Sequence, residues 1–148
     1  MGILEAITGK RVYLDTNIFI YAVEGYAEFQ DVLNELFETF DNGNLKAITS
    51  ELTLAEVLVK PLIDNNTEVC LSYENSIQSS PVLEVVLINR KIIVESARLR
   101  SIINLRLPDA IHGATAILNG CGTFLTNDKR LEALSGINVV ILSNLLSS

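Results

Sequence analysis

The sequence has few of the residues that are typical of disulfide-bonded, zinc-binding or membrane proteins. Its two cysteines, Cys70 and Cys121, lie far apart and in no Cys-x-x-Cys arrangement. They fit neither a disulfide framework nor a zinc site, so we expect buried free thiols. The apolar runs are only a few residues long, whereas a bilayer span needs about 20. Because residues 1–10 also lack the basic-then-apolar order of a signal peptide, we expect a cytoplasmic protein.

Positive charge is scarce as well. The chain has 11 lysines and arginines against 18 aspartates and glutamates, and its formal net charge is −7. This balance disfavours broad, nonspecific binding of nucleic acid through a basic face, although it allows a local basic rim. If some of the acidic residues form a metal site, bound divalent ions would cancel part of the negative charge where a substrate phosphate approaches.

The sequence does contain a regular alternation of short apolar runs and helical patterns. The apolar runs predict strands at residues 11–14, 46–49, 82–88, 123–126 and 138–142. Helical periodicity predicts helices at 18–22, 29–40, 50–60, 92–103 and 109–119. Pro61 should end or bend the third helix, and the polar stretch 64–80 has only a weakly helical middle. Strands of nearly continuous apolar character, separated by helices, predict one α/β domain, residues 1–148, with a parallel sheet covered on both faces.

Four acidic residues recur where apolar runs end or helices begin. Asp15 follows the first predicted strand, Glu56 lies within the apolar third helix, Asp109 follows a Leu-Pro pair, and Asp128 follows the fourth strand. In parallel sheets the ligand site lies beyond the carboxyl ends of the strands, which puts Asp15 and Asp128 on the same side. Two carboxylates about 4 Å apart at an effective dielectric near 20 repel by roughly 4 kcal/mol. Either their pKa values rise or a divalent metal neutralises the cluster.

Three of these acids have respectable structural interpretations. Asp15 could cap the helix that follows it, and Asp128 could cap the short segment 129–134. Asp109 could lie in the first helical turn because a negative charge there is favoured by about 0.3 to 1 kcal/mol. Each interpretation is sound for one residue alone. To explain the whole pattern without a shared site, however, all of them would have to be correct at once.

Glu56 fits a structural interpretation least well. It could form an ordinary surface ion pair with Lys60, four residues further on. A solvated glutamate should have polar neighbours on its helix face, yet Leu52 and Val59 are both apolar. The sequence therefore favours a functional position for Glu56.

Three polar residues accompany the acids. His112, the only histidine, lies one helical turn after Asp109. A single histidine on an apolar helix is more often a packed, hydrogen-bonded residue than a catalytic base. Asn17 and Thr126 lie near Asp15 and Asp128, where they could orient a carboxylate or a bound water, or only satisfy the turn backbone.

Taken together, these segments resemble the PIN domain, the fold of VapC-like toxins and related nucleases. The matching segments are Val12–Asn17, Ser50–Leu58, Leu107–His112 and Phe124–Asp128, and they occur in the order that the family has. Each motif alone is weak, but the set of four spans nearly the whole chain and is specific.

The resemblance implies a three-layer α/β/α sandwich whose central parallel sheet has about five short strands. It also implies a site for Mg²⁺ or Mn²⁺ and cleavage of phosphodiester bonds in RNA by a metal-activated water, which leaves a 5′-phosphate and a 3′-hydroxyl. Carried over position by position, the catalytic and metal-binding set is Asp15, Glu56, Asp109 and Asp128, with Asn17 and Thr126 in support.

Partners follow from the same resemblance. We expect an RNA substrate and, for the toxin half of a toxin–antitoxin pair, a cognate antitoxin protein that covers apolar surface near the acids. The apolar composition is compatible with a homodimer. Basic residues close in sequence to the acids could guide the RNA backbone or simply be solvated; they are Lys60, Arg106, Lys129 and Arg130. Residues 64–80 match no family motif, so partner or substrate specificity could reside there.

Two other functions remain open at this point. A PIN-fold module could bind RNA or protein without cutting it, although no acidic position is missing here. A phosphatase of the haloacid-dehalogenase type also begins with an aspartate after its first strand. That chemistry needs a second aspartate two residues later, and this chain has Asn17 there.

Overall fold

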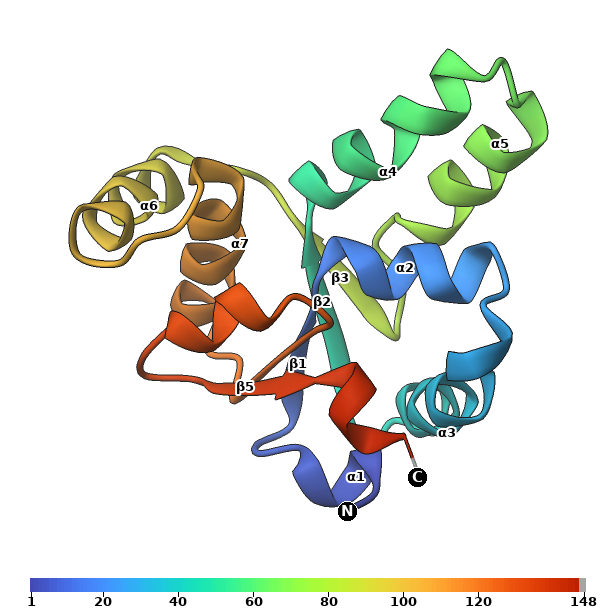
Figure 1. Ribbon diagram of the computed structural model, residues 1–148, viewed down its shortest axis with the longest axis horizontal. Coiled ribbons are helices and arrows are strands. Elements are labelled where there is room, and N and C mark those ends of the chain that lie inside the picture. The colour runs from blue at the N-terminus through green and yellow to red at the C-terminus, as the bar shows by residue number, and fades with distance from the viewer. Residues whose placement is uncertain (147–148) are drawn as a thin grey trace.

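The central sheet is parallel throughout and contains all the predicted strands. We describe residues 1–146 of a computed structural model of the protein, and within them the sheet has five strands in the order β3-β2-β1-β4-β5. The strands are β1 (Arg11–Leu14), β2 (Lys46–Ser50), β3 (Leu83–Val86), β4 (Thr123–Thr126) and β5 (Asn138–Ile141). The first strand therefore lies at the centre, with the later strands added on either side (Figure 1).

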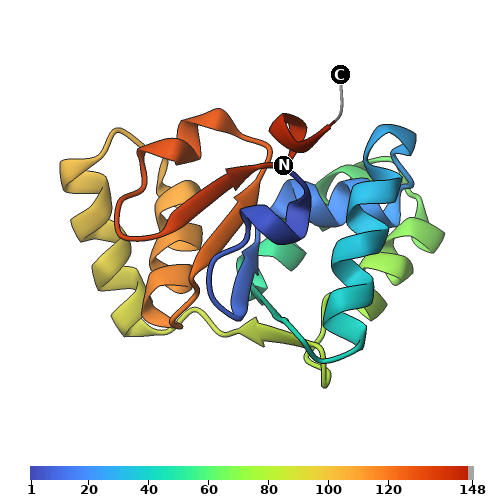
Figure 2. The same cartoon turned by 90° about the horizontal axis from the view of Figure 1, so that it is seen from below.

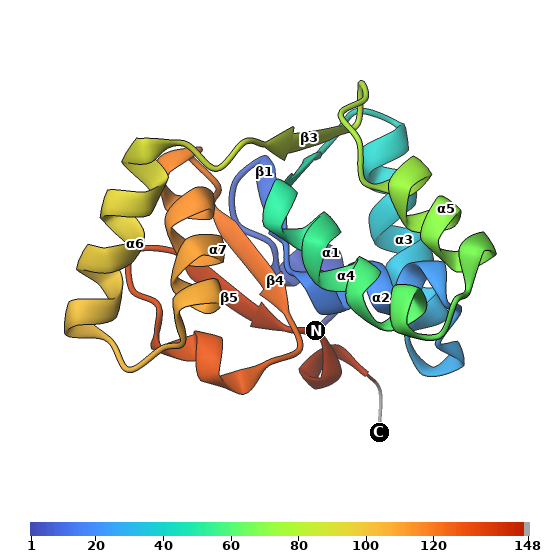
Figure 3. The same ribbon diagram turned by 90° about the horizontal axis from the view of Figure 1, so that it is seen from above.

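Helices cover both faces of this sheet, which confirms the α/β/α arrangement. One side carries α6 (Arg90–Ile102) and α7 (Leu107–Leu118), as Figures 1 and 3 show. The other side carries α2 (Thr16–Val23), α3 (Gln30–Asp41), α4 (Glu51–Ile63) and α5 (Thr67–Ser76). The short α1 (Ile3–Ala6) lies beside α3 (Figure 2). Short 3₁₀ helices occupy Ala27–Phe29 (η1), Lys129–Ala133 (η2) and Leu142–Leu145 (η3).

The central strand divides its side chains between the two halves of the core. Successive residues of a strand point to opposite faces, and accordingly Val12 and Leu14 pack with the helices of the α2–α5 side. Tyr13 points the other way and stacks on Phe124 of β4, with ring centroids 5.0 Å apart. This alternation carries the hydroxyl group of Tyr13 toward α7.

Two helical features differ from the predictions. Pro61 does not end its helix at Lys60, because α4 continues to Ile63. Proline removes only one backbone donor, and here that loss falls in the last turn, where the carbonyl of Pro61 still accepts a 2.8 Å bond from the Asn66 backbone. The polar stretch 64–80 contains a full helix, α5, because Tyr73 and its neighbours give it a buried side that composition alone conceals.

The two cysteines are free and buried, as predicted. Cys70 lies in α5, and Cys121 lies directly before β4. Within residues 1–146, every helix is too short or too polar to cross a membrane.

Candidate active site

Asp15 lies just beyond the carboxyl end of β1 and is almost fully buried, with 7% of its surface exposed. It caps α2, as its structural interpretation predicts: Oδ1 accepts a 2.8 Å hydrogen bond from the backbone N–H of Thr16. The other carboxylate oxygen, Oδ2, accepts a 2.6 Å bond from the hydroxyl of Thr126 at the end of β4. Capping and a place in the site are thus compatible, because one carboxylate does both.

Asn17 and Thr126 tie the ends of β1 and β4 together. The Thr126 hydroxyl, which donates to Asp15, accepts a 3.0 Å bond from the backbone N–H of Asp128 and a 3.4 Å bond from the Asn17 amide. The Asn17 side-chain oxygen accepts a 3.2 Å bond from the backbone of Asn127. Of the roles considered for these two residues, Thr126 orients a carboxylate, and Asn17 satisfies the turn.

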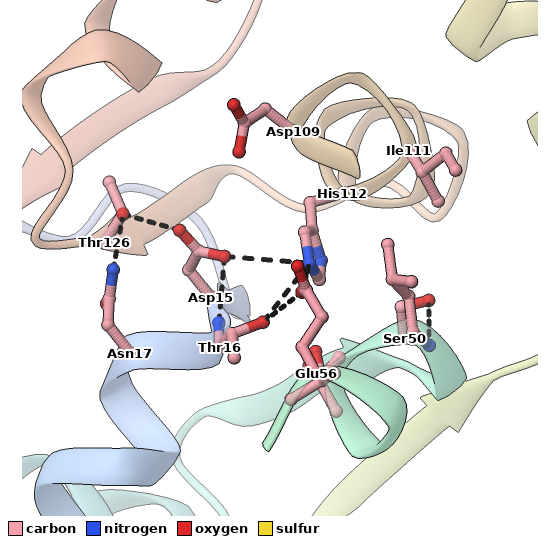
Figure 4. Close-up of polar contacts among 12 residues, drawn as sticks. Asp15, Thr16, Asn17, Ser50, Glu56, Asp109, Ile111, His112 and Thr126 are labelled. Atoms are coloured by element: carbon pink, nitrogen blue, oxygen red, sulfur yellow. Dashed lines mark hydrogen bonds and ion pairs between the residues drawn. The ribbon is translucent and has the colours of Figure 1, made fainter. Parts of the chain in front are cut away.

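Glu56 reaches the same region from the second turn of α4. Its Oε1 accepts a 2.7 Å bond from the Thr16 hydroxyl and lies 2.6 Å from Nε2 of His112 (Figure 4). The alternative surface ion pair is absent, because Lys60 instead contacts Asp64 at 3.0 Å. The Glu56 side chain is therefore held near Asp15 by Thr16 and His112, and it does not pair with Lys60 of its own helix.

His112 lies between these two carboxylates. Its Nε2 is 3.9 Å from Oδ1 of Asp15 as well as 2.6 Å from Glu56. Its Nδ1 is 2.6 Å from the hydroxyl of Tyr13, and only 2% of the side chain is exposed. The prediction of a packed, hydrogen-bonded histidine is confirmed, but its partners include candidate site residues.

The surroundings shift the pKa values of these groups in different directions. Burial raises the pKa of Asp15, and the opposing contributions of His112 and Thr126 do not cancel this. Burial also acts to raise the pKa of Glu56, but hydrogen bonds from His112 and Thr16 outweigh it and lower that pKa. Burial acts to lower the pKa of His112, yet its contacts with Glu56 and Asp15 raise it overall. Glu56 is consequently the carboxylate that ionises more readily.

The other two acids form a second group around arginine side chains. Asp109, in the first turn of α7 and 7% exposed, accepts bonds of 3.1 and 3.4 Å from Arg106. Arg130 of η2 lies 3.7 Å from Asp109 and 2.5 Å from Asp128. This hydrogen-bonded pair lowers the pKa of Asp128. Asp128 also caps η2, as its structural interpretation predicts.

The four acids are thus gathered at one end of the sheet but divided into two pairs. In residues 1–146, no three His, Cys, Asp or Glu side chains are already arranged as a metal-binding group. The donor chemistry nevertheless fits Mg²⁺ or Mn²⁺, which prefer oxygen ligands and are usually held by only one or two protein carboxylates. Asp15 and Glu56, which face the same histidine nitrogen, can provide that number. Asp109 would have to leave its arginine partners to join them.

A family comparison agrees with the fold and with the order of the motifs. The model of the PIN domain family matches residues 12–137. The chain belongs to this family. The haloacid-dehalogenase alternative needs an aspartate at position 17 as an acid and base. The chain has Asn17 there, and its side chain contacts Thr126 and the backbone of Asn127.

Solved structures with the same fold come from toxin–antitoxin complexes. DNA-bound VapBC from Salmonella typhimurium is 20% identical, with a TM-score of 0.71 over 90% of this chain and 99% of that one. VapBC2 from Rickettsia felis, bound to a DNA fragment from its promoter, is 20% identical, with a TM-score of 0.70 over 88% and 98%. A toxin–antitoxin complex from Klebsiella pneumoniae is 24% identical, with a TM-score of 0.64 over 88% and 97%. A comparison with curated proteins gave no match.

Sequence reasoning did not identify how Tyr13, Thr16 and Arg130 contribute to this arrangement. A signal for the first was present: a tyrosine in a buried strand and a lone histidine in an apolar helix each need a polar partner. They satisfy each other at 2.6 Å. The position of Arg130 depends on a side-chain conformation, for which the sequence carries no comparable signal.

Proposed function

We propose that this PIN domain is a divalent-metal-dependent endoribonuclease and the toxin component of a toxin–antitoxin pair. The observation that carries the proposal is the convergence of Asp15, Glu56 and Asp109, from three separate elements, at the carboxyl end of a PIN-fold sheet. Asp15 is only 7% exposed, and its hydrogen bonds come from Thr16 and Thr126 rather than from a lysine or arginine. Burial of a carboxylate without such a pair is costly unless the carboxylate serves as a ligand.

Each acid has a distinct part in the proposed reaction. Asp15 and Glu56 would hold Mg²⁺ or Mn²⁺. Asp109 would complete the set once it separates from Arg106 and Arg130, and Asp128 once it separates from Arg130. The bound ion would supply an acidified water and offset the charge that develops on the scissile phosphate. Thr126 and Thr16 keep the carboxylates of Asp15 and Glu56 oriented through the bonds described above.

The arginines at the site supply the positive charge that an RNA backbone requires. Arg106 and Arg130 are 64% and 52% exposed at their side chains, so a phosphate can reach them. Their guanidinium groups suit bidentate contact with phosphate oxygens. Lys60 contributes less to this proposal, because it is turned to Asp64.

Support for an antitoxin partner comes from the similar structures, which are complexes of toxin–antitoxin systems. A cognate antitoxin and a homodimer of this chain remain part of the proposal. A chain of net charge −7 favours a partner with basic residues near the contact surface.

The rival function is a PIN-fold module that binds without cutting. One observation favours it: Asp109 and Asp128 are paired with arginines rather than free for a metal. The same experiment separates the two functions, because only the nuclease consumes RNA in a metal-dependent way.

The test is cleavage of a fluorescent single-stranded RNA by the full chain, with Mg²⁺ or Mn²⁺ and with EDTA. We expect the native protein to cleave the RNA only when the metal is present. In Asp15→Asn the cleavage rate should fall at least about 10- to 100-fold, which is the loss that typically follows removal of a residue that merely supports a metal ligand. Asp64→Asn is the matched control. In residues 1–146 the only basic side chain that pairs with Asp64 is the exposed Lys60, so this substitution leaves the candidate site unchanged. Undiminished Mg²⁺-dependent activity in Asp15→Asn would overturn the proposal, and melting curves verify that both variants fold.

A further inference from the structure

The only histidine of the chain connects the interior of the sheet to the candidate site. His112 contacts Tyr13 of β1 through Nδ1 and Glu56 of α4 through Nε2, both at 2.6 Å. The Tyr13 and His112 rings meet edge to face, with centroids 5.8 Å apart and planes inclined by 64°. Tyr13 itself is held by stacking on Phe124. The imidazole is therefore fixed on one side by buried aromatic groups and presents one nitrogen to Glu56.

The hydrogen-bond chemistry gives this chain of contacts a direction. Glu56 sets this direction, because an ionised carboxylate can only accept a hydrogen bond, so the 2.6 Å contact requires a proton on Nε2 of His112. In a neutral imidazole Nδ1 then carries no proton and accepts from the hydroxyl of Tyr13, which is fully buried. A charged imidazole carries a proton on Nε2 as well. In either state the N–H at Nε2 points at the carboxylate of Glu56.

Glu56 has a particular need of such a donor. Its side chain is long, 34% exposed and close to a second carboxylate, Asp15. Charge repulsion and side-chain entropy both favour a Glu56 carboxylate that turns away into solvent. Two donors to the same oxygen oppose this: the Thr16 hydroxyl at 2.7 Å and His112 at 2.6 Å. With Oε1 engaged in this way, the second oxygen of Glu56 is left available.

We propose that His112, held by Tyr13, is a positioning residue that fixes Glu56 beside Asp15 so that both carboxylates can bind one divalent metal. This inference rests on the proposed function, because it assumes a metal at these acids. It assigns to His112 no contact with the metal or with RNA. Carboxylate ligands of metals are commonly held by such outer partners, whose loss typically costs about 10- to 100-fold in metal affinity.

The test measures Mn²⁺ binding to the full chain by calorimetry for the native protein, His112→Leu and His112→Gln. Glutamine can place an N–H close to where Nε2 lies, whereas leucine fills space without a donor. We expect His112→Leu to bind Mn²⁺ about 10- to 100-fold more weakly and His112→Gln to recover most of that loss. Equal affinity of the native protein and His112→Leu would overturn the inference while leaving the proposed function intact. Absence of Mn²⁺ binding by the native protein would overturn both.

A second measurement needs no variant at His112 and so does not depend on the folding of one. Because the chain has a single histidine, the imidazole ¹⁵N resonances of the labelled protein report on that residue alone. We expect Nε2 to show the shift of a protonated nitrogen and to move in Glu56→Gln. A bare, unprotonated Nε2 in the native protein would contradict the inference, since it could not donate to Glu56.

Discussion

Arg130 lies 3.7 Å from Asp109, measured from Nη2 to Oδ2, although the two residues belong to η2 and α7. The same guanidinium contacts Asp128 at 2.5 Å. The Arg130 guanidinium therefore lies between Asp109 and Asp128, two of the proposed metal ligands. A divalent cation at this place would neutralise the same two carboxylates. Arginine and metal should compete for these carboxylates.

The first prediction follows from that competition. Arg130→Gln removes the cation and should increase Mn²⁺ affinity. The gain should be only a few-fold, because half-exposed ion pairs contribute little. Calorimetric titration of the full chain measures it. Arg98→Gln is the matched control, since Arg98 pairs with Glu95 on α6, within one helix and away from the site. Tighter binding in both variants, or in neither, would contradict competition at Asp109 and Asp128.

The second prediction concerns the link between β1 and β4. Thr126→Val removes the hydroxyl that donates to Asp15 at 2.6 Å and accepts from the Asp128 backbone at 3.0 Å. Both partners lose a bond, and Thr126 is fully buried, so the free energy of unfolding should fall by about 1 to 3 kcal/mol. Urea unfolding measures this change. Thr39→Val, which removes a hydroxyl bond on the exposed side of α3, should change stability much less.

The third prediction is a pH dependence at Cys121. Burial raises the pKa of this thiol to about 12, so the reactive thiolate is scarce in the folded protein. Below this pKa the ionised fraction is small and rises about tenfold for each unit of pH. Iodoacetamide labelling followed by peptide mass spectrometry should therefore show slow modification of Cys121 that speeds up as the pH rises. If Cys121 is labelled as fast in the folded protein as in urea, the prediction that burial raises the pKa of its thiol is wrong.

Much of the fold could be predicted because its determinants are local. Apolar runs gave the strands, periodicity gave the helices, and the rule for parallel sheets placed Asp15 and Asp128 at the same end. Of the two predicted effects of Pro61, ending the helix is wrong, because the cost of a proline depends on its place in the helix and the last turn tolerates it. The helix α5 was predicted only as a weakly helical stretch, because Tyr73 and Cys70 are too few apolar residues to give a strong period.

The candidate site was less predictable, since it depends on contacts between distant segments. The four acids stand out by position, and the structure gathers them at one end of the sheet. Their division into an Asp15–Glu56 pair around His112 and an Asp109–Asp128 pair around Arg130 results from side-chain conformations that no local pattern encodes. Likewise, the structural interpretations of Asp15 and Asp128 proved correct without excluding a role in the site.

The central claim is that these acids form a divalent metal site, and it is tested most directly by crystals of the full chain soaked in Mn²⁺. Anomalous diffraction then locates the ion without reference to activity. The account predicts an anomalous peak in contact with the carboxylates of Asp15 and Glu56, and its loss in Asp15→Asn. A saturating soak that leaves these carboxylates without a peak, or a peak that persists unchanged in Asp15→Asn, would contradict it.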